Sequence, residues 1–177
     1  MKVLILYATI EGQTGKVAAF LRDQATAAGH EPELVDVGNK MAIVDFDGFE
    51  KIVLAAPVHE RRHPEPFEVF LTGHRDILGD RQTLLLSISL SAAFADGLEE
   101  ARDYLTEMEM RTGFTPTGDA LVAGAVKTGS YDYFASQVVR HVVLGDRDYD
   151  PTKGDHEFTD WGALAMTLTD FLTAPTD

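Results

Sequence analysis

The sequence predicts an α/β domain with a doubly wound, five-stranded parallel sheet of order 2-1-3-4-5 in a three-layer α/β/α arrangement. Three observations predict it. Short apolar runs alternate with segments of helical periodicity. The first run is apolar at every position, as in a strand buried on both faces, and small or hydroxylated residues follow it directly. The 177 residues suit a single domain covering 1–177.

The first half of the chain supplies three strands and two helices of this pattern. The expected strands are 3–7, 33–37 and 52–56, and the expected helices are 14–28 and 64–75. Gly29 follows the first helix and is typical of a helix C-terminus. Pro57 ends the third strand because it has no N–H for the sheet.

The second half continues the alternation and adds two helices at the end. The expected strands are 83–89 and 121–126, and the expected helices are 97–112, 133–144 and 160–172, with a polar, turn-rich stretch at 145–158. Trp161 follows a good N-cap pair, Thr159 and Asp160, so we expect it to anchor the last helix. Tyr131 and Tyr133 are expected to pack at a helix start.

Composition narrows the possible partners and locations. The net charge of −14 disfavours nucleic acid and anionic lipid surfaces as partners. The sequence has no cysteine and no histidine spacing typical of a metal site, so no metal is expected. No apolar run is long enough to cross a membrane. We expect a cytoplasmic protein with at most peripheral contact with the inner membrane.

The loop after the first strand carries the strongest functional signal. It reads Thr9-Ile10-Glu11-Gly12-Gln13-Thr14 and opens directly into the first helix. Free backbone N–H groups and the helix dipole favour a phosphate at such a point, Thr9 and Thr14 can donate hydroxyl hydrogen bonds, and Gly12 permits a tight turn. The alternative is an ordinary N-cap and turn. The position after the first strand of a doubly wound pattern favours the phosphate site.

The same loop resembles the T/S-x-T-G-x-T phosphate loop of flavodoxins, with Glu11 where many flavodoxins carry Thr. Segments 2–14, 123–126 and 158–161 are similar to one branch of that superfamily, the flavodoxin-fold protoporphyrinogen dehydrogenases of bacterial haem synthesis. The resemblance implies a flavodoxin-like fold, FMN as cofactor, and oxidation of protoporphyrinogen IX with electrons passing to a quinone or another acceptor. Those relatives are basic and membrane-associated, and this acidic chain departs from them.

The resemblance also implies that the loops after the third and fourth strands flank the flavin ring. The expected cofactor contacts are Thr9, Ile10, Glu11, Gly12, Gln13, Thr14, Pro57, Val58, His59, Ser91, Ala92 and Phe94. For Phe94, packing against the core is the preferred alternative to a contact with the flavin ring. Neither flanking loop contains the Trp or Tyr with which carrier flavodoxins usually sandwich the ring. This leaves a face of the flavin open to a substrate.

The loop after the third strand also contains Arg61, Arg62 and His63, which could form a positive site for substrate carboxylates such as porphyrinogen propionates. The alternative is a solvated loop paired with Glu60 and Glu65. No catalytic acid or base is identified. Two other functions stay open. One is an acidic electron carrier that docks a redox-protein partner, and the other is a flavodoxin-like domain without enzymatic activity. The oligomeric state is not indicated.

Overall fold

The computed structural model describes residues 1–127 and 154–176, and it confirms the predicted sheet. Five parallel strands lie in the order β2-β1-β3-β4-β5. Their bounds are β1 Lys2–Tyr7, β2 Glu31–Asp36, β3 Lys51–Pro57, β4 Gln82–Ser89 and β5 Gly118–Ala123. All five run the same way, so the loops that follow them gather at one edge of the sheet, and this edge is where ligands bind in doubly wound folds.

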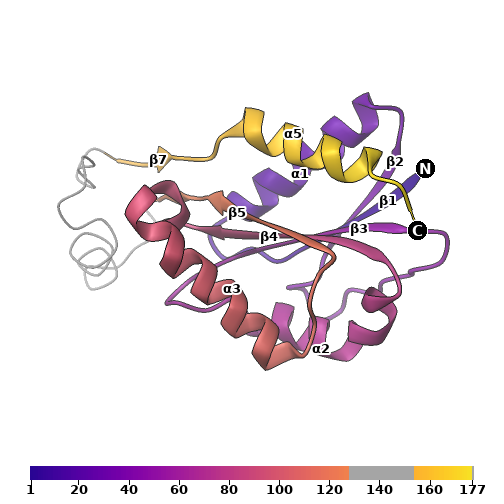
Figure 1. Cartoon of the computed structure of the whole chain (residues 1–177), viewed down its shortest axis with the longest axis horizontal. Coiled ribbons are helices and arrows are strands. Elements are labelled where there is room, and N and C mark those ends of the chain that lie inside the picture. The colour runs from indigo at the N-terminus through magenta and orange to yellow at the C-terminus, as the bar shows by residue number, and fades with distance from the viewer. Residues whose placement is uncertain (128–153, 177) are drawn as a thin grey trace.

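Helices cover both faces of the sheet (Figure 1). The helices are α1 Gln13–Ala27, α2 Glu65–Gly79, α3 Leu98–Thr112 and α5 Trp161–Thr173, with short 3₁₀ turns η1 Ser91–Ala93 and η2 Ala95–Gly97 before α3. α1 and α5 lie on one face, and α2 and α3 lie on the other. The expected helix 133–144, with Tyr131, Tyr133 and residues 145–153, falls outside the described residues.

Alternation along the strands divides the core into two layers. Leu4 and Leu6 of β1 face α2 and α3, where Phe67 and Leu105 pack against them. The intervening residues of β1 face α1 and α5 on the other side of the sheet. Because side chains of a strand point alternately to its two faces, a strand buried on both faces is apolar at most of its positions. The apolar run that predicted β1 has this cause.

Two elements differ from the predictions by more than two residues. α2 continues four residues beyond the expected end at 75, and the added turn buries Leu78 in the core. The expected strand 121–126 is two strands, β5 and the separate β6 Ala125–Val126. The chain leaves the parallel sheet at Gly124, whose N–H donates to Ser89 O, and β6 then pairs antiparallel with β7 His156–Glu157. The break falls inside one continuous apolar run, so periodicity does not reveal it.

Membrane insertion finds no support in the helices that the structure describes. Across residues 1–127 and 154–176, none of them is long and apolar enough to cross a bilayer.

Candidate functional site

The loop between β1 and α1 is built as an anion-binding turn. Gly12 has a φ of 90°, in the left-handed region that favours glycine, and its N–H donates to Thr9 Oγ1 over 3.0 Å. The first hydrogen bond of α1 runs from the Lys16 N–H to the Gly12 carbonyl, at 3.1 Å. The N–H groups of 13–15 therefore precede the helical ladder and point out of the helix N-terminus. Together with the helix dipole, they form a site suited to a phosphate.

Thr14 adds a buried hydroxyl to this turn. The residue is 1% exposed, and Thr14 Oγ1 has no hydrogen-bond partner in the part of the chain that the structure describes. Leaving such a group unpaired costs about 1–3 kcal/mol, so its presence in a native fold calls for an explanation. Thr9 Oγ1 accepts from Gly12 and keeps its own proton to donate. Two hydroxyl donors and a helix N-terminus fit a phosphate ester.

Gln13 serves the scaffold through its side chain. Its Nε2 donates to Glu157 Oε2 and to Thr159 Oγ1, both at 3.0 Å, so the amide points away from the turn and toward β7. We expected Gln13 as a cofactor contact, and only its backbone N–H remains placed for that role. Glu157 also accepts from Lys16 Nζ at 2.5 Å and from Trp161 Nε1 at 2.8 Å.

These contacts tie the start of α5 to the start of α1. The hydrogen bond from Lys16 is the main cause that holds the pKa of Glu157 below its usual range. The Trp161 ring lies 4.9 Å from the ring of Phe20 on α1. The expectation that Trp161 anchors the last helix is therefore confirmed.

Lys127 reaches the same turn, and no pattern in the sequence predicts this contact. Lys127 directly follows β6, and its Nζ lies 3.8 Å from the point where a Cβ on Gly12 would stand. Lys127 and Gly12 are far apart in the chain, and the antiparallel β6–β7 pairing that brings them together follows a break that periodicity does not show. A charge-pattern search along the sequence cannot find such a pair.

The loop after β3 makes a tight two-residue turn. His59 and Arg62 exchange backbone hydrogen bonds of 2.9 and 3.1 Å, and the two residues between them, Glu60 and Arg61, have φ of 50° and 65°. Two successive left-handed residues define a type I′ turn, which ordinarily carries Asn-Gly. Each non-glycine residue there costs roughly 1–2 kcal/mol. Strain of this kind persists where the surroundings impose it, often at ligand-binding loops.

Neighbouring side chains hold this turn in place. Arg61 is largely exposed, pairs with Glu100 at 2.6 Å, and lies over the Tyr104 ring at 5.3 Å. Ser91 Oγ donates to the second oxygen of Glu100 at 3.1 Å, so one carboxylate joins the loop after β3 to the loop after β4. The base of the loop after β3 is fixed by the Val58 N–H, which donates to Ile88 O at 2.7 Å. The two loops therefore form one connected wall.

Arg62 takes a different partner from the one expected. It is bound to the buried carboxylate of Glu68, whose other contacts come from Arg111 on α3. These hydrogen bonds oppose the effect of burial and hold the pKa of Glu68 below its usual range. The sequence suggested Glu60 and Glu65 as pairing partners for the arginines, and the structure corrects this to Glu68 and Glu100.

His63 lies beneath the loop instead of on its surface. It is 2% exposed, and its Nε2 is 3.0 Å from Ser87 Oγ of β4. Burial lowers the pKa of His63 to about 4, so the ring is neutral at physiological pH. The structure therefore corrects the grouping of His63 with Arg61 and Arg62 as one positive patch. The two arginines remain on the surface.

The loop after β4 is compact and partly apolar. Ser91 is buried, and the Ala92 N–H donates to Ser89 Oγ at 3.1 Å. The half-buried Phe94 packs edge-on against Phe158, with ring centroids 5.3 Å apart. Phe94 therefore packs against Phe158, and contacts of Ser91, Ala92 and Phe94 with a cofactor stay predictions.

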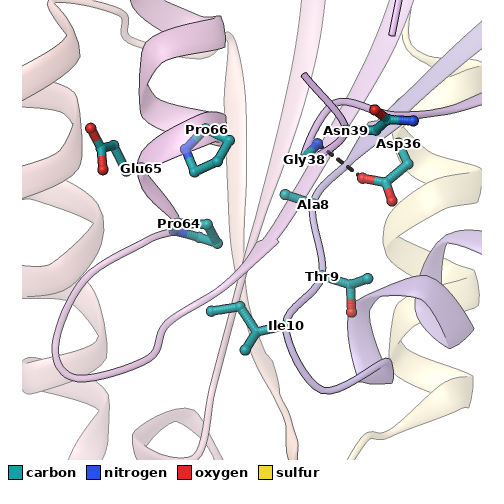
Figure 2. Close-up of a pocket in the computed structure, with 9 residues that line it drawn as sticks. All are labelled: Ala8, Thr9, Ile10, Asp36, Gly38, Asn39, Pro64, Glu65 and Pro66. Carbon is teal, nitrogen blue, oxygen red and sulfur yellow. Dashed lines mark hydrogen bonds between the residues drawn. The ribbon is translucent and has the colours of Figure 1, made fainter. Parts of the chain in front are cut away.

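A cleft of about 460 Å³ opens beside the first loop. The loops after β1, β2 and β3 line it, through Ala8, Thr9, Ile10, Asp36, Gly38, Asn39, Pro64, Glu65 and Pro66. Figure 2 shows Ile10 extending across it toward Pro64, and the Gly38 N–H bonded to Asp36 Oδ1. The volume lies within the range of small-molecule sites. The residues after β2 were not among the expected contacts.

The fold and its first loop define a class of protein: doubly wound α/β domains with an anion-binding turn after the first strand. A family model described as "Flavodoxin domain" matches residues 4–153. The chain belongs to the flavodoxin domain family.

Comparisons with individual proteins agree with this family. The chain is 21% identical to protoporphyrinogen IX dehydrogenase [quinone] of Escherichia coli K12 over 166 residues, covering 93% of this chain and 91% of that protein. Among solved structures, it is similar to oxidised flavodoxin 1 from Bacillus cereus, with a TM-score of 0.56, 14% identity and 99% of each chain covered. A Fusobacterium nucleatum flavodoxin bound to flavin mononucleotide gives a TM-score of 0.50 at 15% identity, covering 97% of this chain and 95% of that one.

Proposed function

We propose that this protein binds FMN and that the turn 9–14 holds the phosphate. One observation carries the proposal: the buried Thr14 hydroxyl, which has no partner in residues 1–127 and 154–176, stands at the N-terminus of α1 beside the left-handed Gly12. A phosphate oxygen would accept from this hydroxyl, from Thr9 and from the free N–H groups. The flavodoxin domain family and a similar flavodoxin bound to flavin mononucleotide support the choice of ligand.

Thr14→Val tests the phosphate assignment. We expect the dissociation constant for FMN to rise roughly tenfold or more, because the change removes a hydrogen bond to a charged group while keeping the shape of the side chain. Titration of the apoprotein, followed by quenching of flavin fluorescence, measures it. Thr26→Val is the control, since Thr26 lies exposed near the other end of α1 and its hydroxyl donates to Arg22 O of the same helix. Equal affinity of Thr14→Val and wild type would show that the loop is misassigned.

We further propose that the protein is an oxidoreductase that oxidises a porphyrinogen, with electrons passing through FMN to a quinone or another acceptor. FMN supplies the two-electron acceptor. The wall formed by the loops after β3 and β4 contains no Trp or Tyr to cover the ring, which favours a substrate approaching it. Similarity to the Escherichia coli enzyme over almost the whole chain supports the same reading.

Arg61 is the residue best placed to meet a substrate carboxylate. Its side chain is 66% exposed, and its present partner, Glu100, is itself 41% exposed. Exposed ion pairs are worth at most about 1 kcal/mol, so a substrate carboxylate can replace Glu100 at little cost. The planar guanidinium suits bidentate pairing with a propionate. The strained turn holds Arg61 outward for this contact.

Anaerobic mixing of the FMN-loaded protein with protoporphyrinogen tests the activity. Bleaching of the flavin absorbance with appearance of porphyrin fluorescence is the expected result. A protein that binds FMN and is not reduced by protoporphyrinogen would contradict the dehydrogenase proposal while leaving the FMN site intact.

An acidic electron carrier is the second candidate function, and the net charge of −14 favours it because such a surface steers basic redox partners. Reduction by a ferredoxin-type reductase, with no reaction toward protoporphyrinogen, would establish it. A protein that stays colourless after incubation with FMN would instead support a flavodoxin-like domain without enzymatic activity.

A further inference from the structure

Lys127 directly follows the short antiparallel ladder formed by β6 and β7. β6 pairs with β7 in the register Ala125↔Glu157 and Val126↔His156. Val126, the residue directly before Lys127, is fully buried. The backbone that carries Lys127 is therefore held from one side by the ladder and from the other by the core.

The same ladder is fixed to the first turn of α1. Glu157, on β7, accepts from the side chains of Gln13 and Lys16. Thr159, two residues on, accepts from Gln13 and donates to Ala123 O at 2.7 Å. Gln13 is buried and directly follows Gly12. These bonds set the position of β6 relative to the turn, and so they bring Lys127 over Gly12.

Gly12 leaves room for a cation to approach. Because Gly12 has no Cβ, no side chain of its own stands between its backbone and the Lys127 ammonium, which lies 3.8 Å from the point where a Cβ would be. Among residues 1–127 and 154–176, Lys127 forms no ion pair, although the chain carries 29 acidic residues. A half-buried lysine without a carboxylate partner, beside a helix N-terminus and an unpaired buried hydroxyl, is suited to an anion.

We propose that Lys127 binds the ligand's phosphate at this turn and makes the site selective for a phosphorylated flavin. This inference rests on the proposed FMN function. The helix N-terminus and the hydroxyls supply hydrogen bonds and partial charges, and Lys127 adds a full positive charge close to Gly12. It offsets the repulsion that an acidic protein exerts on a dianion.

Lys127→Met tests the proposal through a comparison of two ligands. We expect the dissociation constant for FMN to rise roughly tenfold, because an ionic hydrogen bond is lost, while that for riboflavin, which lacks the phosphate, is unchanged. The salt dependence of FMN binding should also become weaker. Lys2→Met is the matched control, since it removes the same charge at the opposite end of β1. Equal FMN affinity in Lys127→Met and wild type would overturn the inference.

A second arm separates this inference from the FMN proposal. Inorganic phosphate should raise the thermal midpoint of the wild-type apoprotein and have a smaller effect on Lys127→Met. If the wild type binds no FMN, the proposed function fails, and the phosphate arm alone decides whether Lys127 belongs to an anion site. If the wild type binds FMN and the two proteins respond equally to phosphate and to FMN, the role of Lys127 fails and the FMN site stands.

Discussion

Replacing Lys51 with methionine is expected to lower the free energy of unfolding by about 3 kcal/mol. Lys51 begins β3 and is fully buried, and its ammonium donates to the carbonyls of Phe171, Leu172 and Ala174 at 2.7, 3.0 and 2.6 Å. These carbonyls lie at the C-terminus of α5, where the helix dipole favours a cation. Burial lowers the pKa of Lys51 because the ammonium loses its hydration, and the three carbonyl acceptors offset this loss.

Methionine keeps the apolar stem of Lys51 and removes the donor from all three carbonyls, of which that of Leu172 is buried. Urea unfolding followed by far-ultraviolet circular dichroism measures the loss, and Lys2→Met serves as the control because Lys2 is exposed at the start of the neighbouring strand. The control should stay within about 0.5 kcal/mol of wild type. A loss below 1 kcal/mol for Lys51→Met would mean that the end of α5 is not held by these bonds.

Acid is expected to destabilise the protein through His63. Burial lowers the pKa of His63 to about 4 in the folded state, against about 6.5 in the unfolded chain. Between these values the unfolded state binds the proton and the folded state does not, so stability falls as the pH falls. Above about pH 6.5 the protonation of His63 takes nothing from the free energy of unfolding, and the loss grows as the pH falls toward 4. Between pH 7 and pH 5 this amounts to about 2 kcal/mol.

His63→Gln provides the comparison, because glutamine does not titrate and can still hydrogen-bond Ser87. Urea midpoints at pH 7 and pH 5 should fall by less in the variant than in wild type, even where the variant is less stable at both. Carboxylates and histidines remote from His63 titrate equally in the two proteins and cancel in the difference, and Glu68 is the titratable group that interacts directly with His63. Parallel pH profiles would show that His63 is protonated as readily in the folded protein as in the unfolded chain.

The pattern of the sequence was sufficient for the central sheet and for the class of the fold. β1, β3 and β4 each contain a short run of consecutive apolar residues, so these strands can be found without an alternating pattern of apolar and polar residues. The split between β5 and β6 at Gly124 could not be found in this way. Both pieces are apolar, and what separates them is a change of pairing partner that only the folded chain defines.

In the site, too, features that depend on local sequence were predicted and features that depend on long-range contacts were not. Thr14 was predicted because its setting, a strand followed by a small loop and a helix, is local in sequence. The roles of Glu157 and Lys127 depend on contacts with Gln13 and Gly12, which are far from them in the sequence. The burial of His63 was missed for a related reason. The sequence pattern of a histidine beside two arginines is typical of a charged surface. Only the contact of His63 with Ser87 shows that this side chain points inward.

The bonds that Lys51 and Gln82 make to the last described residues also fix where that end of the chain lies relative to the sheet. The Pro175 carbonyl accepts from the side chain of Gln82 at the start of β4, and the Met1 carbonyl accepts from the Glu31 N–H at the start of β2. Both described ends therefore lie at the edge of the sheet remote from the turn 9–14 (Figure 1). A tag attached at either end would tether the protein to an electrode with its ligand-binding loops facing the solution, an orientation suited to voltammetry of a bound redox group.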